Sequence, residues 1–446
     1  MQQLLKQLPK IDKFVNLPKF KDCNLKLLTK IVKEKIDSLR ADILENKIAS
    51  FNQEELAQEV LLEYHKLLAP SLKPLINATG VILHTNMGRS LISKEILDRA
   101  SHVICNYSNL EYNQKEGKRG ERYEHVSNHL KTLLNVEDVL VINNNASAVF
   151  LILNTFAKGK EAVVSRGELV EIGGSFRIPE VMANSGAILK EVGATNKTKL
   201  SDYECAISEE TSLLMKVHKS NYSIEGFSAE VDFKDIKELA KKYNLIDYYD
   251  LGSGYLPTLP YNLSSQEEPI GKILQSNPSL ISFSGDKLFG SVQAGVIAGK
   301  KELIDKLKKN QLLRMLRVDK ITLSILEETI KAYLKENFKL IPTLSMLFLT
   351  QEELRDRAKS LSAKIKNSTV VETTTFMGGG TLPNRSFPSV ALHITGKAVS
   401  LERAFRAKDI IGRIEDNKFL LDVRTILPQQ EEIVVNTACE ILKWNT

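Results

Sequence analysis

No stretch of this sequence is long and apolar enough to cross a membrane. The chain has 446 residues, and it nowhere contains the roughly 20 consecutive apolar residues that a spanning helix needs. The first ten residues, MQQLLKQLPK, lack the apolar core of a secretory signal. These absences predict a soluble, cytoplasmic protein that does not act at a membrane.

Cysteine is scarce, and its spacing excludes its usual structural uses. The four cysteines are Cys23, Cys105, Cys205 and Cys439, and none is placed in a C-x-x-C pattern. This spacing predicts reduced thiols rather than a disulfide framework or a zinc site. We therefore expect no metal in this protein.

An excess of charge of one sign is also nearly absent from the whole chain. The 61 basic and 55 acidic residues leave a net charge of +6, which permits an anionic partner but does not argue for one. Residues 1–35 alone hold nine lysines and three acidic residues, so their surplus is 9 − 3 = +6. A lysine-rich segment is usually only a solvated face, and the alternative is a small helical module that docks on a polyanion.

The hydrophobic content of 43% is ample for a chain of this length to fill two or three domains. Apolar residues recur at three- and four-residue steps from Leu28 to Ile43, which predicts an amphipathic helix. Asn52 can cap a second helix, and Pro74 closes the unit. We therefore predict an N-terminal helical domain over residues 1–70.

From about Leu133 the pattern changes to strand-like apolar runs separated by helical stretches. The runs include DVLVINNNAS, EAVVSRGEL, SLLMKVH, NLIDYYDLGSG and LISFSGDK. Such alternation predicts βαβ units and a mostly parallel sheet. A segment without glycine, Lys301 to Ile341, predicts a long helical stretch. We place a large α/β domain at residues 71–325 and a smaller α/β domain at residues 326–446.

Ligands of open parallel sheets bind at the carboxyl ends of the strands. The residues of chemical interest that follow these runs are Asn143 to Ser147, His218, Asp250 and Lys287. Lys287 stands in SFSGDKLFG, just beyond a buried strand, where a partly desolvated amine can act as nucleophile and base, as a Schiff-base lysine must. A lysine on a turn is nevertheless more often merely solvated.

Two further features change the interpretation of this lysine. Asp250 ends an apolar run, where its carboxylate could hold a pyridine nitrogen protonated. INNNASAVF places small residues at a strand-to-helix turn, where backbone N–H groups can hold a phosphate. Taken alone, Asp250 could simply form a turn, and so could the asparagine run. Together, a phosphate cup, a pyridinium partner and a lysine in this order indicate pyridoxal phosphate.

Several longer strings support an identification with a family. They are INATGVILHTNMGRS, GKRGERYEHV, NNNASAVFLIL, SRGELVEIGGSFRIPEVM, VGATNKTKLSDYE, VHKSNYSIEGF, DLGSGYL, SFSGDKLFG and LRVDK. From about Leu75 to its end the chain resembles the bacterial selenocysteine synthases, the L-seryl-tRNA(Sec) selenium transferases. The resemblance implies a fold-type I pyridoxal phosphate enzyme, aspartate aminotransferase-like, with a mostly parallel central sheet.

The resemblance also implies roles for individual residues. Lys287 would bond the cofactor and Asp250 would pair with its ring nitrogen. The remaining cofactor-binding residues would be Asn145, Ala146, Ser147, Ser282, Ser284 and His218. Arginines suited to bidentate binding of selenophosphate would be Arg89, Arg314 and Arg317, although arginines spaced like the last two also occur as ordinary exposed pairs.

The implied reaction starts from serine esterified to tRNA(Sec). The serine hydroxyl is lost by β-elimination, and selenium from selenophosphate adds to the dehydroalanyl-tRNA. The basic N-terminal domain would bind the tRNA, DNA would not be a partner, and the enzyme would be a homodecamer built of dimers. The family's first threonine of VGTTN is Ala194 here, and this departure bears on subunit contacts.

Two other functions remain open at this point. A small-molecule pyridoxal phosphate lyase, such as a cysteine or selenocysteine lyase, would have similar cofactor residues. The appended helical domain and the absence of a cysteine in a catalytic-loop motif argue against it. A tRNA-binding protein on an inactive enzyme scaffold is the second alternative, and the presence of both Lys287 and Asp250 argues against that.

Overall fold

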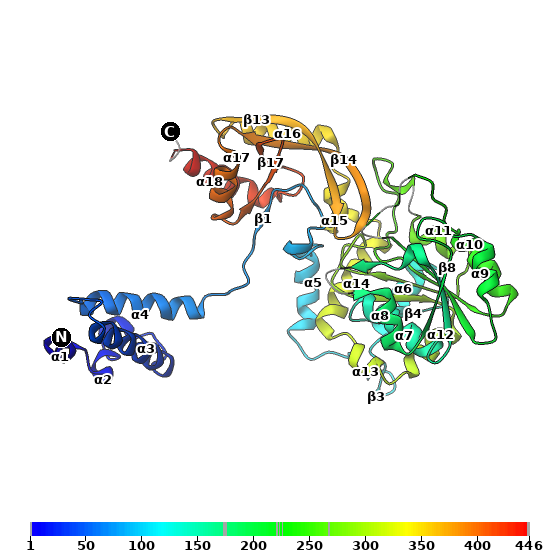
Figure 1. The fold of residues 1–446 in the computed structure, drawn as a ribbon, viewed down its shortest axis with the longest axis horizontal. Helices are drawn as coiled ribbons and strands as arrows, with labels where there is room; N and C mark the ends of the chain where they lie inside the picture. Colours follow the sequence, from blue (N-terminus) through cyan, green and yellow to red (C-terminus); the bar gives the residue numbers. More distant parts are fainter. Residues whose placement is uncertain are drawn as a thin grey trace. The chain divides into compact units, whose positions relative to one another are not determined.

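The computed structural model describes residues 2–172, 176–219, 222, 224, 226–265 and 268–443. Parts of two strings quoted above, at 173–175 and at 220, 221, 223 and 225, lie outside the described residues. The chain forms two compact units, Met1–Pro74 and Leu75–Thr446 (Figure 1). The four cysteines are free thiols, as the sequence predicted.

The N-terminal unit is helical and has its own core. Its helices are α1 (Gln2–Gln7), α2 (Ile11–Phe14), the 3-10 turn η1 (Pro18–Phe20), α3 (Leu25–Leu44) and α4 (Gln53–Leu68). The helix predicted from periodicity is α3, and the helix predicted from the Asn52 cap is α4. The side chain of Asn52 caps α4 by accepting a hydrogen bond of 2.8 Å from the Glu54 N–H. The apolar stripe of α3, including Ile31 and Val32, packs against Val60 of α4.

A seven-stranded sheet is the centre of the larger unit. Its strands, in spatial order, are β4 (Asp138–Ile142), β12 (Gly295–Gly299), β11 (Leu280–Ser284), β10 (Ile246–Asp250), β9 (Thr211–Val217), β5 (Glu161–Ser165) and β8 (Ile188–Val192). Only β12 runs antiparallel to its neighbours in this sheet. The prediction of a mostly parallel sheet is therefore confirmed.

Helices cover both faces of this sheet, which is why its strands are apolar on both sides. One face packs against α7 (Asn145–Phe156), α8 (Ile178–Ser185) and α12 (Lys301–Lys309). The other packs against α6 (Glu124–Leu134), α9 (Leu200–Ala206), α10 (Phe233–Lys242), α11 (Ile270–Leu274) and α14 (Lys320–Leu334). Helix α5 (Lys94–Ile104) packs on α14.

The segment without glycine is helical, but it is not one long helix. It forms α12, the single turn α13 (Leu313–Leu316), α14 and the 3-10 turn η5 (Phe338–Leu340), with breaks at 310–312, 317–319 and 335–337. The capping side chain of Asp319, which accepts from the Thr322 N–H at 2.9 Å, starts α14 afresh. The boundary that the sequence analysis placed between residues 325 and 326 falls inside α14.

The C-terminal part carries a four-stranded antiparallel sheet. Its strands, in spatial order, are β13 (Ser368–Gly378), β14 (Thr381–Ile394), β17 (Lys418–Asp422) and β16 (Arg413–Glu415). The accompanying helices are α15 (Pro342–Leu347), α16 (Gln351–Ser362), α17 (Ala398–Arg406) and α18 (Glu431–Lys443). Among the described residues, no helix combines the length and the hydrophobicity that crossing a bilayer demands.

Candidate active site

The strands β4, β9, β10 and β11 run in the same direction, so their carboxyl ends lie at one edge of the sheet. Asn143 directly follows β4, His218 directly follows β9, and Asp250 is the last residue of β10. Lys287 lies three positions after the end of β11. The structure thus brings these four sequence-predicted residues to the same edge.

Asp250 is a buried carboxylate with neutral hydrogen-bond donors. Its Oδ1 accepts from the side-chain amide of Asn145 at 2.8 Å and from the Gly252 N–H at 2.9 Å. Burial raises the pKa of Asp250, while these two hydrogen bonds and the charge of Lys287 act in the opposite direction. A buried carboxylate in such a position is stabilised by a cation placed beside it.

Lys287 is 8% exposed, so it is not a solvated turn lysine. The turn that carries it is held by two bonds, from the Leu288 N–H to Ser253 Oγ at 3.3 Å and from the Gly290 N–H to the Lys287 carbonyl at 2.8 Å. Gly285 is required there, because a Cβ at that position would lie 2.7 Å from the Val292 carbonyl oxygen. The amine is therefore presented from a rigid turn.

His218 is hydrogen-bonded to Asp250 through its backbone and is influenced by the charge of Lys287. Its backbone N–H donates to the Asp250 carbonyl at 2.9 Å. Burial, together with the charges of Lys216 and Lys287, lowers the pKa of His218 from 6.5 to about 4. The imidazole is consequently neutral at pH 7.

The first turn of α7 lies beside this edge. Gly295 of β12 permits the approach, since a Cβ on it would lie 2.2 Å from the Asn144 carbonyl oxygen. The Asn144 side chain, which the sequence analysis gave no separate role, caps α7 by accepting from the Ser147 N–H at 2.8 Å. Among the residues that the structure describes, the buried Oδ1 atoms of Asn143 and Asn145 have no hydrogen-bond partner, which marks them as acceptors available to a ligand's donor groups.

The two serines of β11 are already engaged. Ser282 Oγ shares a hydrogen bond of 2.7 Å with the Tyr248 hydroxyl, and both residues are fully buried. Ser284 Oγ donates to Asp286 Oδ1 at 2.6 Å. This arrangement does not favour either hydroxyl as a ligand for the cofactor phosphate.

Arg89 contacts the lysine-bearing turn. Its guanidinium donates to Asp286 Oδ2 at 2.6 Å, and its backbone adopts the left-handed conformation with φ of 61°. Sequence reasoning missed Asp286, although its position next to Lys287 in SGDK was a usable signal. The pair ties the segment after Gly88 to the candidate site.

Arg314 and Arg317 line a cavity of about 420 Å³ together with Asn143, Gln293 and Arg122. A hydrogen bond of 2.9 Å from the Asn143 N–H to the Leu316 carbonyl pins α13 to the end of β4. The structure therefore brings Arg314 and Arg317 to the sheet edge, whereas Arg89 does not line this cavity.

Arg122 is a third arginine of this cavity that sequence reasoning missed. It donates to Glu111 Oε1 at 2.8 and 3.1 Å and to the Val318 carbonyl. Hydrogen bonding and charge from Arg122, with further charge from Arg119 and Arg317, lower the pKa of Glu111. Nothing in the string GKRGERYEHV indicates that Arg122 lines the cavity while its neighbour Arg119 is exposed.

Comparison with known proteins gives consistent matches. A family model described as L-seryl-tRNA selenium transferase matches residues 75–427. The L-seryl-tRNA(Sec) selenium transferase of Sulfurimonas denitrificans is 57% identical over 444 residues, which cover 98% of this chain and 99% of the relative. The enzyme of the same name from Aliarcobacter butzleri is 58% identical, with 97% and 98% covered. That of Wolinella succinogenes is 52% identical, with 99% and 100% covered.

Among solved structures, D-glucosaminate-6-phosphate ammonia-lyase superimposes with a TM-score of 0.62. Its sequence identity is 19%, and the alignment covers 85% of this chain and 98% of that one. This likeness concerns the fold alone.

Proposed function

The chain belongs to the L-seryl-tRNA selenium transferase family, and from this premise we propose how its own residues carry out the reaction. Its fold is that of the fold-type I pyridoxal phosphate enzymes, as predicted. The reaction is the conversion of L-seryl-tRNA(Sec) to L-selenocysteinyl-tRNA(Sec). Identity above 50% over nearly the whole chain favours this function over the small-molecule lyase.

The residues at the sheet edge fit pyridoxal phosphate. Asp250 is a buried carboxylate bonded to neutral donors, so a protonated ring nitrogen is a suitable partner for it. Lys287 is a buried amine, and its charge acts on both neighbours: it opposes the rise that burial causes in the pKa of Asp250 and adds to the lowering that burial causes in the pKa of His218. The amino end of α7 offers backbone N–H groups from Asn145 and Ala146 to the phosphate.

Bound pyridoxal phosphate supplies an electron sink that acidifies the Cα–H of serine and allows its β-substituent to leave. Lys287 removes the proton from Cα and returns it at the end of the reaction. Asp250 keeps the ring nitrogen protonated. Neutral His218 borders the same space without adding a positive charge.

The cavity at Arg122, Arg314 and Arg317 is the proposed site of the selenium donor. Selenophosphate is a phosphate-like anion, and guanidinium groups bind such anions through paired hydrogen bonds. The cavity adjoins Asn143 at the end of β4, on the same edge as Lys287. Arg89 contributes from the side of the lysine turn through its contact with Asp286.

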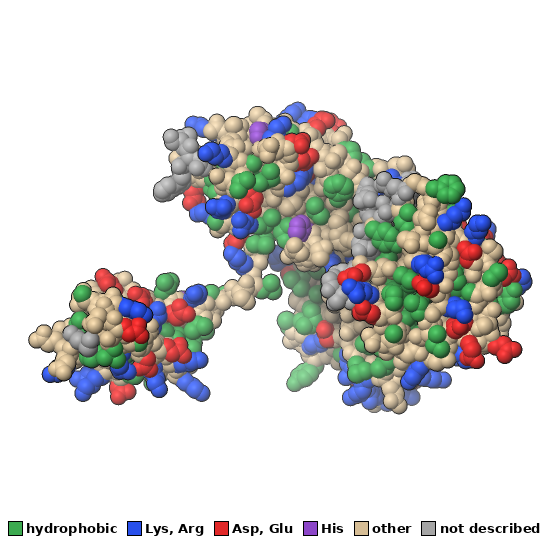
Figure 2. All heavy atoms as spheres, viewed as in Figure 1, with side chains coloured by type: hydrophobic (Ala, Val, Ile, Leu, Met, Phe, Trp, Pro, Cys, Tyr) green, Lys and Arg blue, Asp and Glu red, His purple; other side chains and the backbone are tan. Residues whose placement is uncertain are grey.

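The N-terminal unit is the proposed tRNA-binding domain. Lys19 and Lys35 pair with Glu54 and Glu59 of α4. Within the described residues of this unit, the exposed lysines without a recorded ion pair include Lys6, Lys10, Lys13, Lys21, Lys26, Lys33 and Lys66. Figure 2 shows basic side chains gathered along one side of this unit. Such a surface suits phosphate contacts, which position a nucleic acid without reading its bases.

We also propose that the enzyme acts in the cytoplasm as a homodecamer built of dimers. The proposal rests on the family resemblance, and sedimentation of the purified protein tests it. A monomer or a single dimer in solution would contradict the decamer.

The burial of Lys287 beside Asp250 is the observation that carries the proposed function, and absorption spectroscopy tests it. The purified protein should show the visible band of bound pyridoxal phosphate, and Lys287→Ala should lose the covalently bound cofactor. The band should shift with seryl-tRNA(Sec) and not with free serine or free cysteine. A shift with free cysteine would instead support a lyase, and no band after adding the cofactor would exclude the role of Lys287.

A further inference from the structure

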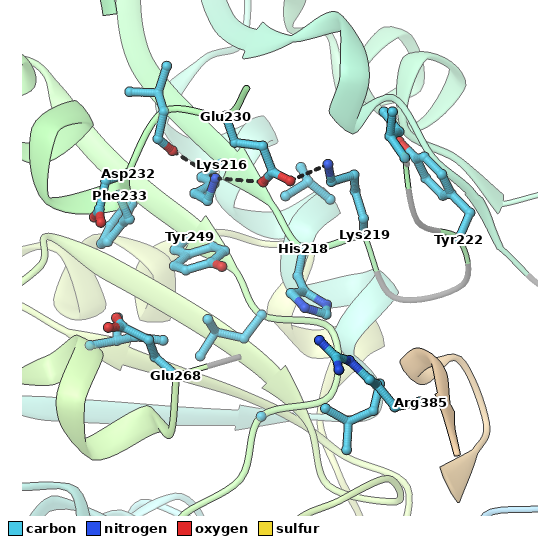
Figure 3. Close-up of a pocket in the computed structure, with 17 residues that line it drawn as sticks. Lys216, His218, Lys219, Tyr222, Glu230, Asp232, Phe233, Tyr249, Glu268 and Arg385 are labelled. Atoms are coloured by element: carbon cyan, nitrogen blue, oxygen red, sulfur yellow. Dashed lines mark hydrogen bonds and ion pairs between the residues drawn. The ribbon is translucent and has the colours of Figure 1, made fainter. Parts of the chain in front are cut away.

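A second cavity borders His218 and has no role so far. It has a volume of about 470 Å³ and lies between β9, β10, the start of α10 and β14 (Figure 3). We propose that this cavity binds the 3′-terminal nucleoside of the aminoacylated tRNA, with its adjoining phosphate. The proposal rests on the proposed function, because it names the part of the tRNA substrate that must enter the active site.

The chemistry of the substrate requires such a space. Serine is joined to tRNA through an ester to the terminal ribose, so that ribose lies one ester group away from the reacting Cα. His218 lines the cavity and bonds through its backbone to Asp250. The cavity therefore adjoins the ends of β9 and β10, next to Asp250, and it is separate from the arginine cavity beside Asn143.

The lining of the cavity suits a nucleobase. The half-buried Tyr249 forms part of its wall, and the buried Phe233 packs against Tyr249 with the ring centroids 4.9 Å apart. Proteins that bind single-stranded RNA ends stack bases on such aromatic rings. The volume lies within the range of small-molecule sites, so a nucleoside can be accommodated.

The cavity contains both a hydrogen-bond donor suited to a phosphate and acceptors suited to ribose or a base. Arg385 of β14 points toward His218 (Figure 3) and makes no ion pair among the described residues. It is the natural partner for the phosphate next to the terminal nucleoside. Glu230, Asp232 and Glu268 are exposed acidic residues of the lining. Glu230 pairs with Lys216 and Lys219, Asp232 accepts from the Lys234 N–H, and Glu268 pairs with Lys272. The lone pairs that these carboxylates have left can accept from ribose hydroxyls or from a base amino group.

A buried ion pair makes this wall rigid. The Glu168 carboxylate accepts from the Val217 N–H at 2.9 Å and from Lys216 Nζ at 3.2 Å. Lys216 also donates to the Val231 carbonyl at 2.9 Å (Figure 3). Glu168 lies beyond the end of β5, and its side chain takes the place of a neighbouring strand by bonding the backbone of Val217, the residue before His218. A cavity with fixed walls can select its ligand without a large ordering cost.

The test compares two probes on the full-length enzyme with bound cofactor. The first is L-serine methyl ester, and the second is the trinucleotide CCA carrying serine as a stable 3′-amide. Binding is followed by the change in the cofactor's absorption. We expect the trinucleotide to bind at least about tenfold more tightly, which is the scale of stacking one base on aromatic side chains.

Two variants test whether the tighter binding of the trinucleotide depends on this cavity. Arg385→Ala and Tyr249→Leu should each remove most of the preference for the trinucleotide and leave the affinity for the methyl ester unchanged. Arg406→Ala, which changes an exposed arginine of α17 paired with Glu402, should keep the full preference. The midpoint of thermal unfolding shows whether each variant is folded. If one of the two cavity variants does not fold, the other one is enough to test the proposal.

The possible failures are distinguishable. If the enzyme converts seryl-tRNA(Sec) but binds both probes equally, or if neither folded cavity variant changes the ratio, the nucleoside site is wrong and the proposed function stands. If the wild-type enzyme does not convert seryl-tRNA(Sec), the proposed function is wrong and the nucleoside site falls with it.

Discussion

The side-chain amide of Asn145 donates a hydrogen bond of 2.8 Å to the carboxylate of Asp250, across 105 positions of sequence. The bond joins the first turn of α7 to the end of β10. It therefore links the element proposed to hold the cofactor phosphate with the residue proposed to hold the ring nitrogen.

Replacing Asn145 with alanine should weaken cofactor binding. Burial raises the pKa of Asp250, and the Asn145 hydrogen bond opposes that rise, so its loss favours the neutral acid. Because hydrogen bonds to charged groups contribute about 1.5–3 kcal/mol, the affinity for pyridoxal phosphate should fall about tenfold or more. Equilibrium titration of the cofactor measures this. Asn154→Ala, on the same helix but bonded to the Ser185 carbonyl, should leave the affinity unchanged.

The stability of the cofactor-free protein should depend on His218 below pH 7. The pKa of His218 is lowered to about 4 in the folded protein, so the unfolded chain takes up the proton first as the pH falls. The contribution of neutral His218 to the free energy of unfolding is complete above pH 6.5 and is lost as the pH falls toward 4. Between pH 7 and pH 4.5 the free energy of unfolding should fall by about 2 kcal/mol for this reason.

The thermal unfolding midpoint checks this dependence. His218→Asn should lose less stability than the wild type on acidification, while His102→Asn, at an exposed position on α5, should behave like the wild type. An equal acid loss in wild type and His218→Asn would contradict the prediction.

Arg317→Ala should raise the KM for selenophosphate by about tenfold or more, the cost of one charge-assisted contact of about 1.5–3 kcal/mol. The cofactor absorption should stay unchanged, because Arg317 lines the separate arginine cavity. Steady-state kinetics with varied selenophosphate measures the effect. Arg119→Ala is the matched control, since Arg119 also pairs with Glu111 but is exposed and does not line the cavity. An equal effect of both variants would argue against the donor site.

Removing residues 1–70 should leave the cofactor bound and abolish productive tRNA binding. The N-terminal unit has its own hydrophobic core, and its exposed lysines supply the proposed phosphate contacts. Binding of tRNA to the full-length protein should also weaken as salt rises, because neutralising phosphates releases counterions. A truncated protein that bound tRNA tightly at moderate salt would refute this role.

Glu168→Ala should destabilise the larger unit by about 3 kcal/mol, because it removes the buried carboxylate that Lys216 pairs with and leaves this ammonium only the Val231 carbonyl and the exposed Glu230. Glu191→Ala breaks the exposed pair with Arg166 and should cost less than about 1 kcal/mol. Chemical denaturation of the two variants measures the difference. Equal losses of unfolding free energy in the two variants would mean that the buried Glu168–Lys216 pair matters no more to stability than an exposed pair.

Local patterns predicted much of the molecule. Helix α3 follows from apolar periodicity, because the side of a helix that is buried repeats every three to four residues, and the start of α4 follows from the capping residue Asn52. The alternation of strands with helices predicted the mostly parallel sheet, and placing Asp250 and Lys287 after apolar runs predicted that they meet at one edge. The helical stretch expected over Lys301 to Ile341 is present, but it is divided into several helices, because the Asp319 cap restarts the chain as α14.

Residues close together in the chain were enough to predict the elements and the edge of the sheet at which the reactive residues lie. Which side chains meet at that edge became clear only from the folded chain. Ser282 turns to Tyr248, Arg122 joins Arg317, and Glu168 meets Lys216 48 positions away. Such pairings depend on distances between elements that are remote in sequence, and no local period of hydrophobic residues records those distances.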